Sequence, residues 1–231
     1  MPCQHPIKLN KLCALCGQEV QDTENTKFYN ALHSNSRLRV DKSTIDGMYV
    51  RYRDELIQKK KMILVVDLDQ TILHSIEVKG GRVGDNGSRN RNGECGGRGI
   101  TNKQLLQARP RQPLPSSFTY TLASTTMKTT LRPHLHTFLT ELNEMFHMHI
   151  YTMGTSEYVH QITNVIDRDR SLFGDRIVTR DDEVLVKRLE RLFGDREDMV
   201  VVIDDRGDVW EYCGNLVMIR PFFGVDCGGE E

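Results

Sequence analysis

The sequence predicts a Rossmann-like α/β fold with a doubly wound parallel sheet, and three observations support this prediction. First, two runs without a polar side chain, 62–66 and 199–203, are typical of strands that are buried on both faces of a parallel sheet. Second, helical and strand periodicities alternate from Leu131 onward, which implies parallel strands joined by right-handed crossovers. Third, polar residues follow the predicted strands, at the edge where open α/β sheets bind ligands.

The second half of the chain contains the clearest alternation. Leu135, Phe138, Leu139 and Leu142 recur at helical spacing, so a helix is expected from about residue 135 to residue 146. Further helices are expected at 156–166 and 185–193, and further strands at 149–152, 176–179, 199–203 and 216–219.

The first half of the chain divides into segments of different composition. Residues 1–20 carry cysteines and a histidine, and residues 21–60 are predicted to be a helical lead-in, because apolar residues recur at helical spacing in 49–57. The catalytic domain is expected at 61–225 with a flexible surface insertion at 79–127, since residues 79–99 contain eight glycines. Within this insertion, alternation around 118–123 indicates a strand or a hairpin arm, and residues 226–231 are a tail.

The composition excludes some classes of partner. The chain has 231 residues with 31 basic and 32 acidic side chains, so its net charge of −1 gives no reason to expect direct binding to nucleic acid. Its apolar runs are too short to span a bilayer, and its N-terminus has no hydrophobic signal region, so we expect an intracellular protein without a membrane partner. In that setting the six cysteines are thiols or metal ligands rather than disulfides.

Candidate catalytic residues gather at the predicted strand ends. A lone Asp there is often a helix N-cap, and a lone Lys on a helix is usually solvated, but this ordered combination is better explained by chemistry. Buried acids cost several kcal/mol each without compensation, which a divalent cation and a lysine would supply. The residues are Asp67, Asp69 and Thr71 after the first strand, Thr152 after the second, Lys187 after the third, and Asp204, Asp205 and Arg206 after the fourth.

The segment 67–71 matches the signature D-x-D-x-T, and through it the chain resembles the aspartate-based phosphatases of the haloacid dehalogenase superfamily. Within that superfamily it is more similar to the phosphatases of the RNA polymerase II C-terminal domain, of the type first found associated with transcription factor TFIIF. The motifs that carry the resemblance are LVVDLDQTILHS (64–75), LRP (131–133), YTMGT (151–155), VKRLERLF (186–193) and VVIDDRGDVW (201–210). It covers about 62–225, together with the Cys/His start.

Phosphoryl transfer depends on positioning and charge neutralisation more than on nucleophile strength, so an aspartate suits it. Asp67 is the expected nucleophile, and Asp69 is the expected general acid and then general base. Thr152 and Lys187 would bind and neutralise the phosphate. Mg²⁺ would be held by Asp67, the backbone carbonyl of Asp69 and Asp205, while Asp204 would support either Lys187 or the metal waters.

The resemblance adds expectations that the residues alone do not give. It implies that Thr71, Arg132, Tyr151 and Arg206 also line the phosphate site, although Arg132 can also be read as a residue of a first helical turn. It implies a Mg²⁺-dependent protein serine phosphatase of the nucleus that acts on the phosphorylated C-terminal repeats of the largest RNA polymerase II subunit, with TFIIF as a partner. The alternative is a catalytically inactive phosphopeptide-binding or scaffold protein, but the presence of both Asp67 and Asp69 favours the enzyme.

Two features leave alternatives open. Cys3, His5, Cys13 and Cys16 fit a Zn²⁺ site of the Cys₃His type, a zinc knuckle in 1–20, but they can equally be reduced surface thiols beside a histidine. The aromatic residues Trp210, Tyr212, Phe222 and Phe223 are either core residues or an apolar slot for a proline-rich peptide.

Overall fold

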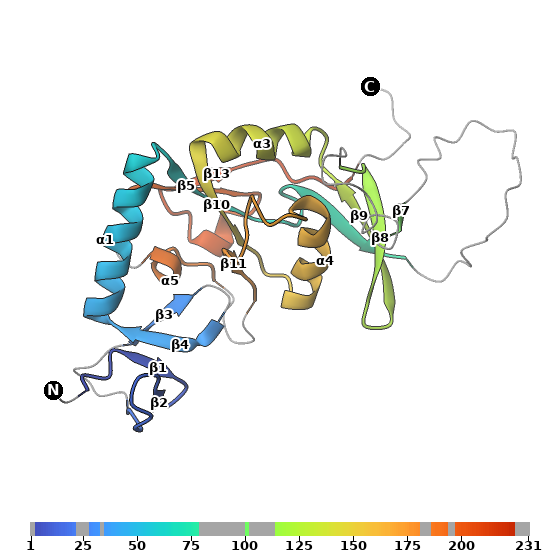
Figure 1. Ribbon diagram of the computed structural model, residues 1–231. Coiled ribbons are helices and arrows are strands. Elements are labelled where there is room, and N and C mark those ends of the chain that lie inside the picture. Colours follow the sequence, from blue (N-terminus) through green and yellow to red (C-terminus); the bar gives the residue numbers. More distant parts are fainter. Residues whose placement is uncertain are drawn as a thin grey trace, which may run out of the picture.

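The structure is a computed structural model that describes residues 3–21, 28–32, 35–78, 100–101, 114–180, 186–193 and 197–224 (Figure 1). The glycine-rich part of the predicted insertion, at 79–99, and the predicted tail at 226–231 lie outside these residues. Within the described ranges, no helix is both long and apolar enough to cross a membrane.

A five-stranded parallel sheet forms the centre of the molecule, and it confirms the predicted doubly wound fold. β5 lies in the middle of the sheet and pairs with β10 on one side and β12 on the other, so that Val66 lies beside both Ile150 and Ile203. The strands in spatial order are β11 (Ile177–Val178), β10 (Phe146–Tyr151), β5 (Met62–Val66), β12 (Val200–Asp204) and β13 (Leu216–Met218).

Apolar clusters cover both faces of this sheet, which explains why β5 has no polar residue. Leu64 and Val66 belong to a cluster with residues of α3 (Leu135–Met145) and α4 (Ser156–Ile166). Ile63 and Val65 point to the other face, where the cluster includes residues from three further helices of the described ranges. These helices are α1 (Lys42–Gln58), α5 (Glu190–Phe193) and the 3₁₀ helix η1 (Asp208–Trp210).

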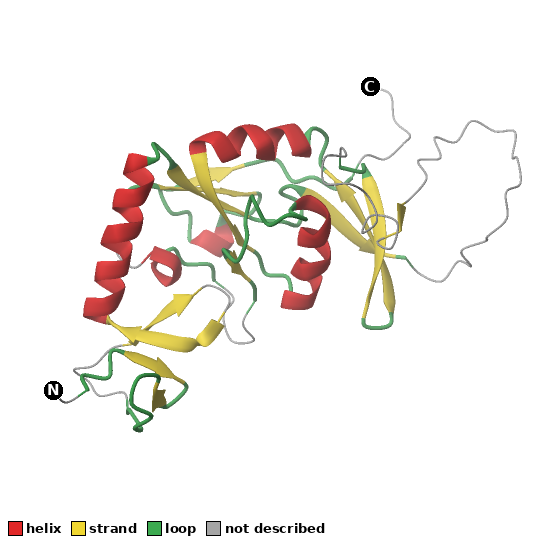
Figure 2. Ribbon diagram, in the orientation of Figure 1, coloured by secondary structure: helices red, strands yellow, loops and turns green. Residues whose placement is uncertain are grey.

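A second sheet is inserted between β5 and α3, and it confirms the hairpin arm expected around 118–123. Its strands in spatial order are β6 (Leu73–Glu77), β9 (Thr125–Leu131), β8 (Ser117–Leu122) and β7 (Ile100–Thr101). Phe118 and Tyr120 of β8 are buried in the same cluster as α4. Figure 2 shows this sheet and the N-terminal strands as separate groups on opposite sides of the central sheet.

The helix predicted around 49–57 is confirmed by α1, but the N-terminal sheet shows that the helical lead-in does not extend over all of 21–60. Only Lys42–Gln58 form a helix, whereas Phe28–Leu32 and Asn35–Asp41 are the strands β3 and β4. The spatial order is β2 (Leu12–Cys13), β1 (Ile7–Leu9), β4 and β3. The prediction was wrong for 28–41 because β4 is fixed by pairing with the distant β1, with Ile7 opposite Val40, and local periodicity does not report such pairing.

Lys187 also lies in a different local structure from the one predicted. The sequence predicts a helix over 185–193, but α5 begins at Glu190 and residues 181–185 lie outside the described ranges. The backbone N–H of Lys187 instead donates to the carbonyl of Val209, at 2.8 Å. Lys187 is therefore held by the 3₁₀ helix η1, which follows β12, rather than by a helix of its own.

Candidate active site

Asp67, Lys187 and Asp204 form a buried ionic cluster at the carboxyl end of the central sheet. Asp67 follows β5, Asp204 ends the neighbouring β12, and the Lys187 Nζ donates to Asp67 Oδ1 at 2.5 Å and to Asp204 Oδ2 at 2.6 Å. The exposed fraction of the side chains is 8% for Asp67 and 2% for each of the others. One ammonium group therefore faces two buried carboxylates, and this excess of negative charge suits a cation.

The pKa values of this cluster reflect burial first. Burial raises the pKa of Asp67 to about 7, against the opposing effect of Lys187 and with a further rise from Asp204. Burial lowers the pKa of Lys187, but the two carboxylates outweigh it and the pKa is raised overall. Lys187 is therefore charged, whereas the ionised form of Asp67 needs additional positive charge nearby.

Asp204 is oriented by donors on the loop that follows β12. Trp210 Nε1 donates to Asp204 Oδ2 at 2.7 Å, and the backbone N–H of Arg206 donates to Oδ1 at 2.9 Å. Trp210 is 3% exposed and packs edge-on against Tyr151, with ring centroids 5.3 Å apart. The slot interpretation is therefore wrong for Trp210, which is a core residue that also holds a carboxylate.

Thr71 joins the two acidic loops. Its hydroxyl donates to Asp205 Oδ1 at 3.2 Å and accepts from the backbone N–H of Asp205 at 3.1 Å. One carboxylate oxygen from each of Asp67, Asp204 and Asp205 lies within 4.8 Å of the others. A compact set of carboxylate oxygens suits a hard divalent cation such as Mg²⁺, so the residues fit a metal of that kind.

Asp69 lies beside Tyr158, a residue that the sequence analysis did not single out. Tyr158 OH donates to Asp69 Oδ1 at 2.7 Å and is itself 2.9 Å from the hydroxyl oxygen of Ser75 on β6. Burial raises the pKa of Asp69, although the hydrogen bond from Tyr158 lowers it. The sequence signal that could have pointed to Tyr158 is its position in the first turn of the predicted helix 156–166. This turn follows Thr155, whose side chain caps the helix.

Thr152 follows β10, and its side chain is 1% exposed. Its hydroxyl oxygen accepts from the backbone N–H of Gly154 at 3.0 Å, so its O–H can donate to a phosphoryl oxygen. Gly154 is required by close packing, because a Cβ atom there would lie 2.5 Å from the ring of Tyr158.

Arg132 makes its contacts through backbone carbonyls. Its guanidinium donates to the carbonyls of Thr71 at 2.8 Å and of Arg220 at 3.0 Å, and it lies over the ring of Phe222. It lies before α3 rather than in its first turn. Arg132 therefore stabilises the loop that carries Thr71, and its contact with phosphate stays a prediction.

The other two residues expected to line the phosphate site, Arg206 and Tyr151, contact residues around the acidic cluster. The guanidinium of Arg206 donates to both carboxylate oxygens of Asp208. Tyr151 is buried, and its ring centroid is 5.9 Å from Lys187 Nζ. Their roles in substrate binding stay predictions.

The N-terminal candidates also come together, far along the chain from the acids. Cys3 Sγ is 3.8 Å from Cys13 Sγ, and Cys16 Sγ is 3.2 Å from His5 Nδ1. Burial would raise the pKa of the Cys13 thiol, but hydrogen bonds from His5 and the backbone of Cys16 and Leu15 outweigh it and lower the pKa to about 6.

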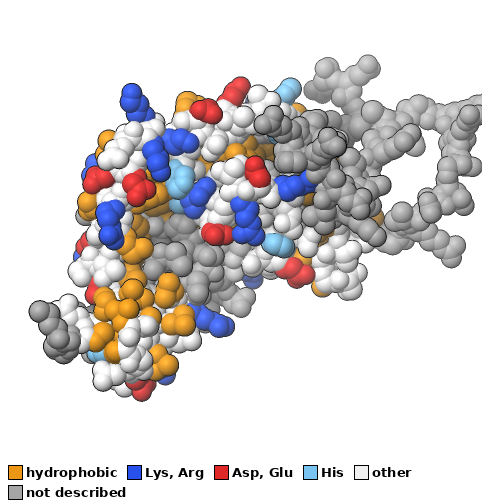
Figure 3. Space-filling model, in the orientation of Figure 1, with side chains coloured by type: hydrophobic (Ala, Val, Ile, Leu, Met, Phe, Trp, Pro, Cys, Tyr) orange, Lys and Arg blue, Asp and Glu red, His pale blue; other side chains and the backbone are white. Residues whose placement is uncertain are grey.

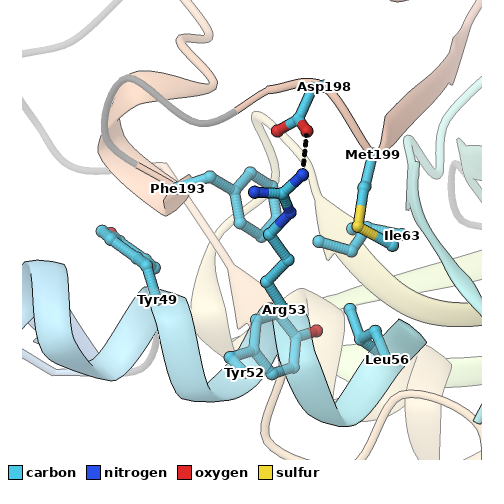
Figure 4. Close-up of a pocket in the computed structure, with 8 residues that line it drawn as sticks. All are labelled: Tyr49, Tyr52, Arg53, Leu56, Ile63, Phe193, Asp198 and Met199. Carbon is cyan, nitrogen blue, oxygen red and sulfur yellow. Dashed lines mark ion pairs between the residues drawn. The ribbon is translucent and has the colours of Figure 1, made fainter. Parts of the chain in front are cut away.

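A small pocket lies beside the first residues of β5 and β12, at the end of these strands away from the acidic cluster. It lies between α1, β5 and α5, and the ion pair of Arg53 and Asp198, at 3.0 Å, lies beside its apolar walls (Figure 4). None of the candidate residues lines it. Its lining residues are Tyr49, Tyr52, Arg53, Leu56, Ile63, Phe193, Asp198 and Met199.

A parallel α/β sheet with acidic residues at the carboxyl ends of its central strands, beside a buried lysine, is the arrangement expected of the haloacid dehalogenase-like fold. The chain belongs to the NLI interacting factor-like phosphatase family, whose model matches residues 62–230. Families of this class use a divalent metal, and the carboxylate cluster fits one.

Proteins with related sequences are named as phosphatases of the RNA polymerase II C-terminal domain. The one from Encephalitozoon cuniculi is 34% identical over 96% of this chain and 46% of its own length. Those from Schizosaccharomyces pombe and Homo sapiens are 32% and 27% identical, over 96% and 95% of this chain and 30% and 22% of their own lengths. The chain thus spans less than half the length of each of these three relatives.

Two solved structures share the fold. One is described as Fcp1, an essential RNA polymerase II CTD phosphatase, with a TM-score of 0.57 and 31% identity over 76% of this chain and 46% of that one. The other is a fission yeast Fcp1 variant bound to beryllium fluoride, with the same TM-score and identity over 76% of this chain and 45% of that one.

Proposed function

We propose that this chain is a Mg²⁺-dependent protein serine phosphatase that acts on the phosphorylated C-terminal repeats of the largest RNA polymerase II subunit. One observation carries the proposal: Lys187 is shared between the buried carboxylates of Asp67 and Asp204, and a carboxylate oxygen of Asp205 lies within 4.8 Å of both carboxylates. A catalytically inactive scaffold would have no need to keep these charges buried together, because buried ion pairs add little stability compared with apolar packing.

In the proposed reaction, a carboxylate oxygen of Asp67 attacks the phosphorus of phosphoserine. The bond between phosphorus and the serine oxygen breaks, and an aspartyl-phosphate forms on Asp67. Lys187, 2.5 Å from Asp67, neutralises charge on the phosphoryl oxygens, and Thr152 donates a hydrogen bond to one of them.

Asp69 moves the protons in both steps. It gives its proton to the leaving serine oxygen and later takes one from the water that hydrolyses the aspartyl-phosphate, which releases inorganic phosphate. The raised pKa of Asp69 favours the protonated form needed first. Tyr158 holds the carboxyl group through its 2.7 Å hydrogen bond.

Asp67, Asp205 and the backbone carbonyl of Asp69 would hold Mg²⁺. Asp204 is assigned to the support of Lys187, because Lys187, Trp210 and the Arg206 N–H already occupy its oxygens. When bound, the cation supplies positive charge against the phosphoryl oxygens and the carboxylates. A structural Zn²⁺ in the N-terminal Cys/His cluster is also part of the proposal but takes no part in the reaction.

The substrate is taken from the relatives, which are named as phosphatases of the RNA polymerase II C-terminal domain. We further propose a nuclear location, where that substrate acts, and TFIIF as a partner, because the motifs at 64–75 and 201–210 resemble the TFIIF-associated type of these phosphatases. Co-precipitation with purified TFIIF and fluorescence localisation of the tagged chain would check the last two.

The experiment is the release of inorganic phosphate from a phosphoserine peptide of polymerase heptad repeats, with Mg²⁺ present. Wild type should turn over the heptad peptide faster than a phosphoserine peptide of unrelated sequence, and Asp67→Asn should abolish turnover of both. Asp198→Asn is the matched control, because Asp198 is exposed and paired with Arg53 at the surface. Activity of Asp67→Asn at the wild-type level would overturn the nucleophile, whereas equal turnover of both peptides would overturn only the substrate.

A further inference from the structure

The side chains of Cys3, His5, Cys13 and Cys16 converge on one point. All four ligand atoms lie within 4.8 Å of one another. The distance of 3.8 Å between the Cys3 and Cys13 sulfurs equals the S–S edge of about 3.8 Å that tetrahedral zinc with Zn–S bonds of about 2.3 Å requires. It is far longer than a disulfide bond of about 2.05 Å, and the cysteines are free.

The backbone is shaped to present these ligands. Cys13 ends β2, and the turn that follows returns through Gly17, at a φ of +75°, with the Gly17 N–H donating to the Cys13 carbonyl at 2.9 Å. The N–H of Leu15 points to Cys13 Sγ at 3.4 Å, a contact that stabilises a metal-bound thiolate. His5 adopts a φ of 52°, which a residue with a side chain rarely adopts unless its surroundings require it.

Within the described residues 3–21, Lys8 and Cys13 are the buried side chains, and the leucines are exposed. Leu9, Leu12 and Leu15 are 45%, 53% and 64% exposed, while Cys13 is 2% exposed. In Figure 3 apolar side chains gather on the surface over the N-terminal part of the molecule. Apart from its pairing with β4, a segment this small with its leucines in solvent gains little stability from apolar burial, so a bound metal would stabilise it.

The same segment is continuous with the start of α1. β1 pairs with β4, the N–H of Asp41 donates to the carbonyl of Pro6 at 2.9 Å, and the Asp41 carboxylate caps α1 by accepting from the N–H of Thr44 at 2.7 Å. β4 therefore connects the backbone around the cysteines to the first turn of α1, so fixing the cysteines also fixes the start of α1.

We infer that Cys3, His5, Cys13 and Cys16 bind one Zn²⁺ and that this ion anchors the N-terminal sheet and the start of α1. The thiols lose their protons on binding, and His5 binds as neutral imidazole through Nδ1. The ion has no contact with the acidic cluster, so this inference stands or falls separately from the phosphatase reaction.

Elemental analysis of the full chain, purified without chelators, is the first test. We expect one zinc per chain in wild type and in Cys213→Ser, which removes a free cysteine outside the cluster. Cys13→Ser and Cys16→Ser should each lose the zinc, and Cys16 is exposed, so its replacement leaves the packing intact. Wild type without zinc, or with iron in its place, would overturn the inference, and this result does not depend on the folding of any variant.

Two further measurements separate an anchoring ion from an adventitious one. Co²⁺ in place of Zn²⁺ should give the visible absorption of tetrahedral cobalt and a thiolate charge-transfer band, both lost in Cys16→Ser. Hydrogen exchange of residues 35–44 should speed up when the metal is removed, while hydrolysis of a small aryl phosphate in Mg²⁺ stays unchanged. Octahedral cobalt spectra, or unchanged exchange after metal removal, would contradict the anchoring role.

Discussion

The replacement Lys187→Met leaves two carboxylates buried without their shared ammonium group. Asp67 and Asp204 have side chains that are 8% and 2% exposed, and they lie 2.5 Å and 2.6 Å from Lys187 Nζ. Removing one partner of a buried ion pair costs about 3–5 kcal/mol. At about 2–4 °C per kcal/mol for a chain of this size, the melting temperature should fall by about 6–20 °C.

Calorimetry in metal-free buffer measures this fall, and Lys59→Met is the matched control. Lys59 makes the same kind of ion pair with Glu55, at 3.9 Å, but both side chains are 64% exposed, so its loss should cost about 0–1 kcal/mol. Adding Asp204→Asn to Lys187→Met should recover part of the lost stability, because one buried charge disappears. If Lys187→Met melts at the same temperature as Lys59→Met, the buried cluster does not exist as described.

Three other predictions concern the chemistry and its surroundings. Asp69→Asn should lower kcat/KM for a phosphoserine peptide more than for an aryl phosphate, because only the poor leaving group needs a proton; equal losses would contradict the acid role. EDTA should stop turnover, with Mg²⁺ restoring it and Ca²⁺ restoring it poorly, because Ca²⁺ favours higher coordination numbers; full activity in EDTA would contradict the metal requirement. Burial and the charges of Arg176, Lys59 and Lys61 lower the pKa of His147 from 6.5 to about 4. The folded state therefore binds fewer protons than the unfolded state in that window, so the free energy of unfolding should fall from pH 6.5 to pH 4, and less steeply in His147→Gln by denaturant titration.

The parallel sheet could be predicted from the sequence, because it depends on local pattern. The fully apolar stretch before Asp67 is typical of a strand buried on both faces, and the alternation of helical and strand patterns after Leu131 implies parallel strands. Thr152 and Asp204 therefore come beside Asp67, as expected for residues that follow neighbouring parallel strands.

Features that depend on distant contacts could not be predicted in this way. From the sequence, Trp210 is either a core residue or part of an aromatic slot. Only the fold shows that its indole N–H donates a hydrogen bond to Asp204. Tyr158 reads as an apolar-face residue of a helix, although its hydroxyl contacts Asp69, 89 positions away. The strand at 35–41 was missed for the same reason, since its partner is β1 and not a neighbour in sequence.

β5 lies at the centre of the sheet, between β10 and β12. The chain between β5 and α3 adds an entire second sheet, yet Asp67 still lies directly beside Asp204. Long insertions in such connections cost little in loop entropy, because that cost rises only slowly with loop length. Connections between strands can therefore lengthen, shorten or gain new surfaces while the acidic cluster stays in place. The crossovers are thus the part of the fold where members of this family can differ at little cost.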